Sequence, residues 1–389
     1  MPRIHHALGL HFHQPPGNIE FLLSTEREEA LRILRCYTRP LKHLSSGVAP
    51  INMSISGVLM DQMLRVHVDE LEEELGVTLR KYASLPNVEV LATGFYHPIF
   101  PLIPEDDWKP HIVRWIRLAK RVGFQFSGFW PPELGFTMKM IPLLSELGFK
   151  YVVVDGRYID GRGVDGAYRP YIAEYSGAEI TVIPRNEQFS RILAGGADAS
   201  SFVKALRSET SRFRGDLLVT TWFDGENGDW LRGTLSGNFW DSFFKPYVSL
   251  LEQDDEVTLT SISSFLREHP PEDHASIRTG AWRTFSNDGE FFTQWAGLEA
   301  QRLALARVWE ASMWLRRIKT LIGDSEKSDF KELQVAEEHL LRAQTSCNFF
   351  WEDKWLHKVY DELLLVQFHL NRVVEKAGLF KDNLMEGIE

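Results

Sequence analysis

The sequence predicts an α/β fold, in which a barrel of alternating strands and helices is followed by a helical region. Short runs rich in β-branched and aromatic residues, bounded by Gly and Pro, recur up to about residue 265. Amphipathic stretches separate most of them, and this order predicts a parallel sheet. Beyond about residue 295 the runs stop. The predicted strands are residues 7–13, 51–56, 88–93, 126–130, 151–154, 179–183 and 216–223.

Both a closed barrel and a doubly wound open sheet satisfy this order. The helical stretches between the strands include residues 27–45, 60–82, 106–122, 137–147 and 199–212. The barrel is favoured because the notable polar residues all fall at the C-terminal ends of predicted strands, where barrel active sites are built. These residues are His11, His13, His97, Glu133, Asp155, Arg185 and Asp224.

The C-terminal part of the chain has the apolar periodicity of packed helices. Its clearest stripe has alternating spacings of three and four and consists of Leu356, Val359, Leu363, Val366, Leu370 and Val373. Two more helices are expected near residues 293–322 and 328–346, with Gly323, Asp324 and Ser325 as the turn between them. These helices would complete a bundle.

The chain is therefore expected to have two domains. Residues 1–265 would form the catalytic barrel, and residues 266–389 a helical region that caps the barrel mouth. The glycine-rich stretch 156–176 is expected to be an inserted loop that shapes access to the site.

Composition excludes several classes of protein. The formal net charge of −11 argues against a nucleic-acid surface, which needs clustered Lys and Arg. No stretch reaches 18 apolar residues, so no membrane span is expected. Cys36 and Cys347 are the two cysteines, too few for a disulfide scaffold, and a reducing cytoplasm is the expected location. Histidines interrupt the N-terminal segment, so no export signal is expected.

Two segments each place carboxylates beside tryptophan at the end of a predicted strand. One is Phe-Trp-Pro-Pro-Glu-Leu-Gly at residues 129–135, and the other is Trp-Phe-Asp-Gly-Glu-Asn-Gly-Asp at residues 222–229. Cleavage of a glycosidic bond needs one carboxylate at the anomeric carbon and one carboxylic acid to protonate the leaving oxygen. Any single acidic residue is more often an exposed turn residue, but the shared context favours sugar chemistry.

The N-terminal segment His11-Phe12-His13-Gln14-Pro15 places two imidazoles on one face of a strand. With His97 as a third ligand, they would resemble the metal site of a carbohydrate deacetylase. That class also needs metal-binding Asp residues near the first strand, where Pro-Pro-Gly-Asn stands instead. Hydrogen bonds to sugar hydroxyls are therefore the preferred interpretation, and no metal is predicted.

The order of these motifs resembles glycoside hydrolase family 57. The resemblance rests on four segments that follow one another along the chain: His11-x-His13-Gln14-Pro15, Thr93-Gly94-Phe95-Tyr96-His97-Pro98, Gly128-Phe129-Trp130-Pro131-Pro132-Glu133 and Asp224-Gly225-Glu226. It covers the whole chain. It implies an incomplete seven-stranded (β/α) barrel followed by a helical region, and a retaining enzyme that acts on α-glucans.

The resemblance also implies catalytic roles. The Glu of the third motif is the nucleophile in the family, which maps onto Glu133, and the Asp of the fourth is the general acid/base, which maps onto Asp224. In a retaining mechanism the two carboxyls lie about 5 to 5.5 Å apart, and the acid is kept protonated by a raised pKa. Glu226 would raise that pKa by repulsion or bind a hydroxyl. No cofactor is expected.

Substrate contacts are expected from both halves of the chain. His13 and Gln14 inherit this role from the family motif, and aromatic rings near the carboxylates are expected to hold sugar, although each could equally be packed in the core. The expected contact residues are His11, His13, Gln14, His97, Trp130, Trp222, Glu226, Trp282, Phe350 and Trp351. The fifth family motif is sought at Trp282 with residues 286–290, or in the aromatic cluster at residues 348–351.

Two positions depart from the family pattern. Members commonly carry Phe-Gly two residues after the Asp-x-Glu unit, whereas Asn227-Gly228-Asp229-Trp230 follows here, so the shape of the site beside the acid differs. The segment from Ile183 to Ser190 has Asn186 where Asp is more frequent, and a structural role is expected for it.

The leading hypothesis is hydrolysis of α-1,4 linkages, with α-1,6 linkages as a second option. The alternatives are a 4-α-glucanotransferase or a branching enzyme on the same scaffold, and a metal-dependent polysaccharide deacetylase. A catalytically silent glucan-binding protein is a further class, against which the intact pair Glu133 and Asp224 argues. The sequence leaves the oligomeric state open.

Overall fold

The computed structural model describes residues 2–47, 49–161, 163–226, 237–282, 292–323, 331–351 and 354–379. The chain divides into two compact units. The first comprises Met1–Phe95 and Ile112–Trp282, and the second comprises Tyr96–His111 and Arg283–Glu389. The second unit therefore combines a short stretch from the middle of the sequence with the C-terminal part. The functional division into a catalytic and a capping domain stays a prediction.

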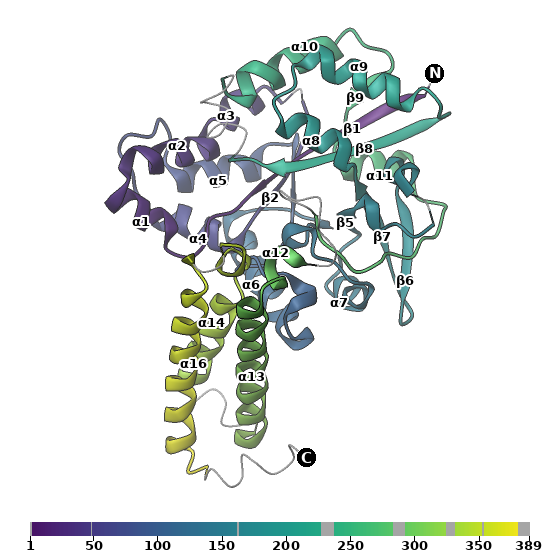
Figure 1. The fold of residues 1–389 in the computed structure, drawn as a ribbon. Coiled ribbons are helices and arrows are strands. Elements are labelled where there is room, and N and C mark those ends of the chain that lie inside the picture. Colours follow the sequence, from purple (N-terminus) through teal and green to yellow (C-terminus); the bar gives the residue numbers. More distant parts are fainter. Residues whose placement is uncertain are drawn as a thin grey trace. The chain divides into compact units, whose positions relative to one another are not determined.

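The first unit is built around one sheet (Figure 1). Among the described residues its strands are β1 (Arg3–Phe12), β2 (Ile51–Ile55), β3 (Val88–Leu91), β4 (Gly128–Phe129), β5 (Tyr151–Asp155), β6 (Tyr171–Tyr175), β7 (Ala178–Arg185), β8 (Asp216–Asp224) and β9 (Val257–Leu259). Each predicted strand coincides with one of them. β6 and β9 were not predicted.

Seven strands follow the order β3-β2-β1-β8-β7-β5-β4, and all neighbours along this path are parallel. A parallel bridge between Ala92 and Phe129 joins the β3 end of the path to β4. β7 and β8 pair at a single position, Arg185 with Thr220. The predicted incomplete (β/α)7 barrel is thus confirmed and nearly closed, with single pairs at two junctions, between β7 and β8 and between the β3 end and β4.

The lengths of two strands follow from their sequences. β1 is buried from Ile4 to Phe12, as expected of a parallel strand that is covered on both faces. β4 ends after two residues because Pro131 and Pro132, two positions further on, lack the N–H that continued pairing needs.

Helices alternate with the strands, as predicted. They are α1 (Asn18–Thr25), α2 (Arg27–Thr38), α3 (Pro40–Leu44), α4 (Gly57–Arg65), α5 (Leu75–Ser84), α6 (Trp108–Val122), α7 (Ile141–Glu146), α8 (Glu187–Ala194), α9 (Ala199–Thr210), α10 (Lys245–Leu251) and α11 (Ile262–Glu268). Short 3-10 turns are η3 (Pro132–Leu134), η4 (Met138–Met140), η5 (Gly156–Tyr158) and η6 (Gly163–Tyr168), and a π-turn, η9, covers Trp240–Phe244. The stretch expected as one helix over residues 60–82 is two helices, α4 and α5.

We expected the stretch 156–176 to be a loop, but it is not a loop throughout. Its end forms β6, which pairs antiparallel with β7, with Tyr175 opposite Ala178. Between them Ser176 and Gly177 have φ of 51° and 77°. Two residues with positive φ are typical of the tight turn of a β-hairpin.

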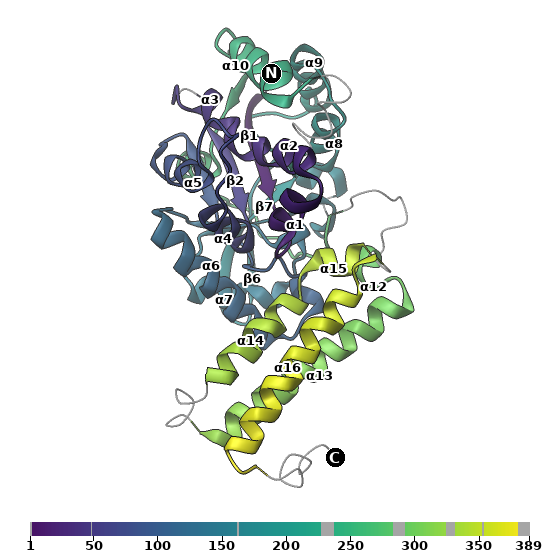
Figure 2. The ribbon, with the colours of Figure 1, turned by 90° about the vertical axis from the view of Figure 1, so that its left-hand side faces the viewer.

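The second unit is helical. Its elements include η1 (Phe100–Leu102), η2 (Glu105–Asp107), α12 (Thr293–Ala296), α13 (Glu299–Ile322), α14 (Lys331–Ala343), α15 (Ser346–Phe350) and α16 (His357–Lys376). α13, α14 and α16 run side by side (Figures 1 and 2). Most of the predicted stripe on α16 is buried, with Val359 and Val373 fully covered. In the described part of the chain no helix combines the length and the apolar character that crossing a membrane requires.

Residues 96–111 belong to the second unit because their side chains bond to its C-terminal helices. Asp107 is buried and accepts hydrogen bonds from Ser312 Oγ at 3.1 Å, from Gln344 Nε2 at 2.6 Å and from Arg316. His111 Nε2 lies 2.8 Å from Gln344 Oε1. Charged and polar groups buried together in this way tie two distant stretches of sequence into one unit.

Candidate active site

Three carboxyl groups follow strand ends on the C-terminal side of the barrel. Glu133 lies in η3, soon after β4. Asp224 is the last residue of β8, and Glu226 lies in the turn beyond it. Since β4 and β8 belong to the same parallel path, their C-terminal ends open at the same end of the barrel.

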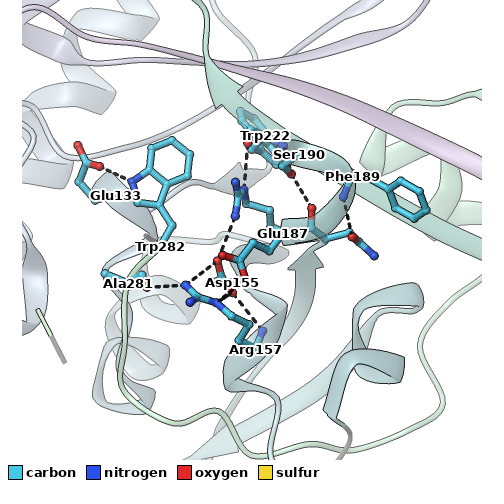
Figure 3. Close-up of polar contacts among 11 residues, drawn as sticks. Glu133, Asp155, Arg157, Glu187, Phe189, Ser190, Trp222, Ala281 and Trp282 are labelled. Atoms are coloured by element: carbon cyan, nitrogen blue, oxygen red, sulfur yellow. Dashed lines mark hydrogen bonds and ion pairs between the residues drawn. The ribbon is translucent and has the colours of Figure 1, made fainter. Parts of the chain in front are cut away.

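Glu133 is held by Trp282 in two ways. Trp282 N donates a 2.8 Å hydrogen bond to the main-chain oxygen of Glu133, and the Trp282 indole N–H donates to its carboxylate (Figure 3). The backbone of Glu133 has a φ of 54°, a left-handed conformation that is uncommon for residues other than glycine. Such strained conformations cluster at functional sites. Trp282 therefore fixes both the backbone and the side chain of Glu133.

Asp224 lies between β1 and a buried arginine. It pairs with His11 in the register of β8 and β1. Arg185, the last residue of β7, donates to the main-chain oxygen of Trp222 at 2.9 Å and to Asp155 at 3.1 Å (Figure 3). The charge of Arg185 partly offsets the effect of burial, which raises the pKa of Asp224, so the guanidinium acts electrostatically on this carboxyl.

The pKa values of the two carboxyls are both raised. Burial, with a further contribution from the charge of Asp224, raises the pKa of Glu133 to about 8, although the Trp282 hydrogen bond opposes this. Burial raises the pKa of Asp224 to about 6, against the charge of Arg185. The pair is therefore electrostatically coupled. Between these two values the pair holds one proton, and the two pKa values belong to the pair as a whole.

Glu226 is buried next to this pair. Its carboxylate accepts hydrogen bonds from His13 N at 3.0 Å and from Tyr37 Oη at 2.8 Å. Burial and the charge of Asp224 raise the pKa of Glu226 to about 8. Glu226 thus anchors the main chain of the N-terminal His13-Gln14 segment beside Asp224.

Aromatic side chains near the carboxyls pack against one another. The His11 and Trp130 rings stack with centroids 4.0 Å apart, and Trp130 lies 5.9 Å from Trp222 and 5.5 Å from Trp282. Trp130 and Trp222 are fully buried, whereas Glu133 and Asp224 keep partial exposure. The two indoles are thus part of the packed core beside the site, and their predicted contact with sugar stays a prediction.

His13 and Gln14 lie at the end of β1 and are half-buried. His13 Nδ1 lies 2.8 Å from Ser56 Oγ, and Gln14 Oε1 accepts from Asn18 Nδ2 at 2.7 Å. Burial lowers the pKa of His13 to about 3 and holds the pKa of His11 well below its usual range. Both imidazoles are therefore neutral at pH 7, a form that both donates and accepts hydrogen bonds.

The other predicted contact residues lie in the second unit. His97 is buried with its Nδ1 2.8 Å from Ser346 Oγ, and Phe350 lies against Trp295 with ring centroids 6.5 Å apart. Trp351 is largely exposed and lies beside Trp355. Residues 286–290 of the fifth motif and residues 227–230 after the fourth lie outside the described residues.

The histidines predicted as alternative metal ligands form no compact ligand group within the described parts of either unit. Among the described residues, the His, Cys, Asp or Glu side chains whose ligand atoms lie close enough to hold one metal ion are instead His5, Asp216 and His269. All three belong to the first unit.

The sequence places Arg185 at the active-site end of the barrel but does not predict its electrostatic effect on Asp224. A structural role is expected for the segment from Ile183 to Ser190. The segment does contribute structure, since Asn186 caps α8 and Ser190 Oγ accepts from Trp222 N at 3.1 Å. Tyr37 of α2 was not noticed at all, because nothing local marks a tyrosine inside an amphipathic helix as a partner of Glu226.

A family model agrees with these observations. The model of Glycosyl hydrolase family 57 matches residues 8–278, which contain all three carboxyls.

The individual relatives and solved structures have low sequence identity to this chain. The alpha-amylase of Pyrococcus horikoshii is 27% identical over 274 residues, which cover 70% of this chain and 41% of the relative. This chain thus spans about two fifths of the length of the curated relatives that it matches. The structure of 4-alpha-glucanotransferase from Thermococcus litoralis has a TM-score of 0.75 at 20% identity, covering 94% of this chain and 60% of that chain. The GH57-type branching enzyme from Pyrococcus horikoshii has a TM-score of 0.73 at 16% identity, covering 97% and 95%. These structures share the fold.

Proposed function

Because this chain belongs to glycosyl hydrolase family 57, we propose that it is a retaining enzyme that hydrolyses α-1,4 linkages of α-glucans. The observation that carries the proposal is the coupled pair of Glu133 and Asp224 at the C-terminal end of the barrel. Retaining glycosidases need such a pair, with one carboxylate as nucleophile and one acid to protonate the leaving oxygen.

In the proposed mechanism the carboxylate of Glu133 attacks the anomeric carbon while Asp224 donates its proton to the glycosidic oxygen. The bond to the leaving sugar breaks, and a covalent glycosyl-enzyme forms. Asp224, now ionised, removes a proton from water, whose oxygen attacks the same carbon and releases Glu133. Two displacements at one carbon retain its configuration.

This chemistry needs the singly protonated pair, with its proton on Asp224 and with Glu133 ionised. The pKa values of about 8 for Glu133 and about 6 for Asp224 bound the pH range in which the pair carries one proton. Positive charge that develops at the anomeric carbon stabilises the ionised form of Glu133. We expect a bell-shaped pH profile of kcat/KM, with limbs near these two pKa values.

Trp282→Phe should change this profile in a defined direction. The substitution removes the N–H that lowers the pKa of Glu133, so this pKa rises above about 8. The singly protonated pair then persists to higher pH, and its proton lies on Glu133 more often than in the parent chain. We expect kcat/KM to fall about tenfold for each pKa unit, and its alkaline limb to move to higher pH.

The matched control is Trp222→Phe. It removes an indole from the same buried cluster, but this indole does not bond to Glu133 in the described structure. The alkaline limb of the control should stay in place. An unmoved limb in Trp282→Phe would show that Trp282 does not tune the nucleophile.

Sugar hydroxyls are proposed to contact His11, His13, Gln14, His97 and Glu226, with rings of Trp130, Trp222, Trp282, Phe350 and Trp351 as the aromatic contacts. The neutral imidazoles of His11 and His13 support the polar part of this proposal. The helical region is proposed to cap the barrel mouth, and a cytoplasmic location is proposed from the low cysteine content.

A second candidate is transfer of the glucan to another sugar. A curated relative from Thermococcus litoralis, 26% identical, is named 4-alpha-glucanotransferase. Transfer uses the same glycosyl-enzyme and differs only in the acceptor that Asp224 deprotonates. Incubation with maltoheptaose separates the two, since hydrolysis yields only shorter sugars, whereas transfer also yields longer ones. Longer products as the main outcome would replace hydrolysis by transfer or branching.

Turnover should survive dialysis of the full chain against EDTA, because the proposed roles of Glu133 and Asp224 need no cation. The measurement is kcat on maltoheptaose well below the unfolding temperature, before and after dialysis. Release of acetate from an acetylated polysaccharide that is lost when a bound zinc ion is removed, and that returns with added zinc, would instead support the deacetylase hypothesis.

A further inference from the structure

A cluster of metal-ligating residues lies at the other end of the barrel strands. His5 is near the start of β1, Asp216 is the first residue of β8, and His269 directly follows α11. One ligand atom from each lies within 4.8 Å of the others. His5 and His11 are six residues apart on one strand, so this cluster is about 20 Å from the carboxyl pair.

The distances suit a small tetrahedral ion. Ligand bonds of 2.0 to 2.2 Å place the ligand atoms of tetrahedral zinc about 3.3 to 3.6 Å apart. His5 Nε2 and Asp216 Oδ1 are 3.1 Å apart, slightly less than that separation. The ligand atom of His269 lies within 4.8 Å of the other two, and its side chain is only half-buried.

The surroundings are also compatible with a bound ion. Phe265 of α11 packs against both imidazoles, with centroid distances of 5.2 Å to His5 and 4.7 Å to His269. This ring orients both ligands and forms an apolar wall beside them, as around many metal sites. The Asp216 side chain is 37% exposed, so an ion can enter from solvent.

We propose that His5, Asp216 and His269 bind one zinc-class divalent ion that ties the starts of β1 and β8 to the end of α11. Two imidazoles and one carboxylate are borderline ligands, which suit zinc better than calcium or magnesium. Water would supply the fourth ligand. The role is structural, because the ion binds the folded arrangement and not the unfolded chain.

The test uses the full chain without a histidine tag, stripped with EDTA and titrated with zinc chloride by calorimetry. We expect one zinc ion per chain and a rise in the unfolding temperature that EDTA reverses. At a free zinc concentration of about 100 times Kd, the ratio of folded to unfolded chains should rise about 100-fold. Cobalt in place of zinc should give the visible absorption of a tetrahedral ion.

Loss of a residue that only supports a metal ligand typically lowers metal affinity roughly 10- to 100-fold. We expect a larger loss of zinc affinity in His269→Ala and in Asp216→Asn, because each removes a ligand. Both side chains reach solvent, so the variants are expected to fold, which circular dichroism checks. Their turnover well below unfolding should equal that of the parent chain.

His67→Ala is the matched control. His67 also lies beside two carboxylates, Asp69 at 3.0 Å and Glu74 at 3.6 Å, but each faces a different ring nitrogen. Zinc uptake should be unchanged in this variant. No stoichiometric uptake by the parent chain, or equal uptake by His269→Ala and Asp216→Asn, would overturn the proposal. Zinc uptake does not depend on turnover, so a failed glycosidase assay leaves this test intact.

Discussion

Glu133→Gln is expected to lower kcat on maltoheptaose by about 10⁴-fold or more, with the fold unchanged. Glutamine has nearly the same volume and can still accept the Trp282 N–H bond, but it cannot form the glycosyl-enzyme. Asp224→Asn should cost about 10²- to 10⁴-fold, the usual contribution of a general acid/base. Circular dichroism and thermal unfolding check that both variants stay folded.

Rescue experiments separate the two roles. Azide should restore activity to Glu133→Ala by attacking from the vacated space, and the glycosyl azide formed should have the inverted configuration. Asp224→Asn should still form the glycosyl-enzyme rapidly on an aryl glycoside whose leaving group needs no protonation, which gives a burst of the aryl alcohol, while the second step stays slow because its base is missing. The opposite pattern of rescue would exchange the two roles.

Glu226→Gln provides the control for this pair. It removes a third carboxylate from the same site, but the amide oxygen can still accept from His13 N and Tyr37 Oη. Its loss of turnover should be smaller than that of Glu133→Gln or Asp224→Asn. If both of those variants kept near-normal turnover on every α-glucan, the catalytic assignment would be wrong.

A chain that ends at residue 290 is expected to aggregate or to lose all activity. The second unit combines Tyr96–His111 with Arg283–Glu389, so the truncation removes most of it. The retained stretch would lose Ser312, Arg316 and Gln344, which bond to Asp107. It would also expose side chains that are buried in the whole chain, namely Tyr96, Ile99, Phe100, Ile103 and Trp108. Large uncovered apolar patches promote aggregation.

Soluble yield, size-exclusion chromatography and turnover measure this effect. A chain that ends at Leu379 is the control, since it keeps α16 and every other described element. It should remain soluble and active. A soluble and fully active fragment of residues 1–290 would show that the helical region contributes neither to stability nor to the site.

Much of the barrel could be predicted because its signals are local. Each strand of the parallel path is a run of β-branched and aromatic residues that ends at a polar residue, a Gly or a Pro, and such patterns are visible within a few residues. For the same reason the positions of Glu133 and Asp224 at strand ends could be predicted. The predicted helix over residues 60–82 was wrong because nothing in its apolar pattern marks the break between α4 and α5.

Elements that depend on a partner were missed. The residues of β6 look like part of a glycine-rich loop until β7 lies beside them, and β9 has three residues that pair with β1. From the sequence, residues 96–111 were expected to belong to the barrel. The hydrogen bonds of Asp107 instead join them to helices that lie more than 200 residues further along the chain.

By itself the sequence determined the succession of most strands and helices along the chain, the residue types at the site and the family resemblance. Only the tertiary structure decided what surrounds each carboxyl. Trp282 is 149 positions from Glu133, and Arg185 reaches Asp224 from a different strand. A pKa depends on burial and on charges within a few ångströms, whatever their distance along the chain, so these values exist only once the barrel has folded.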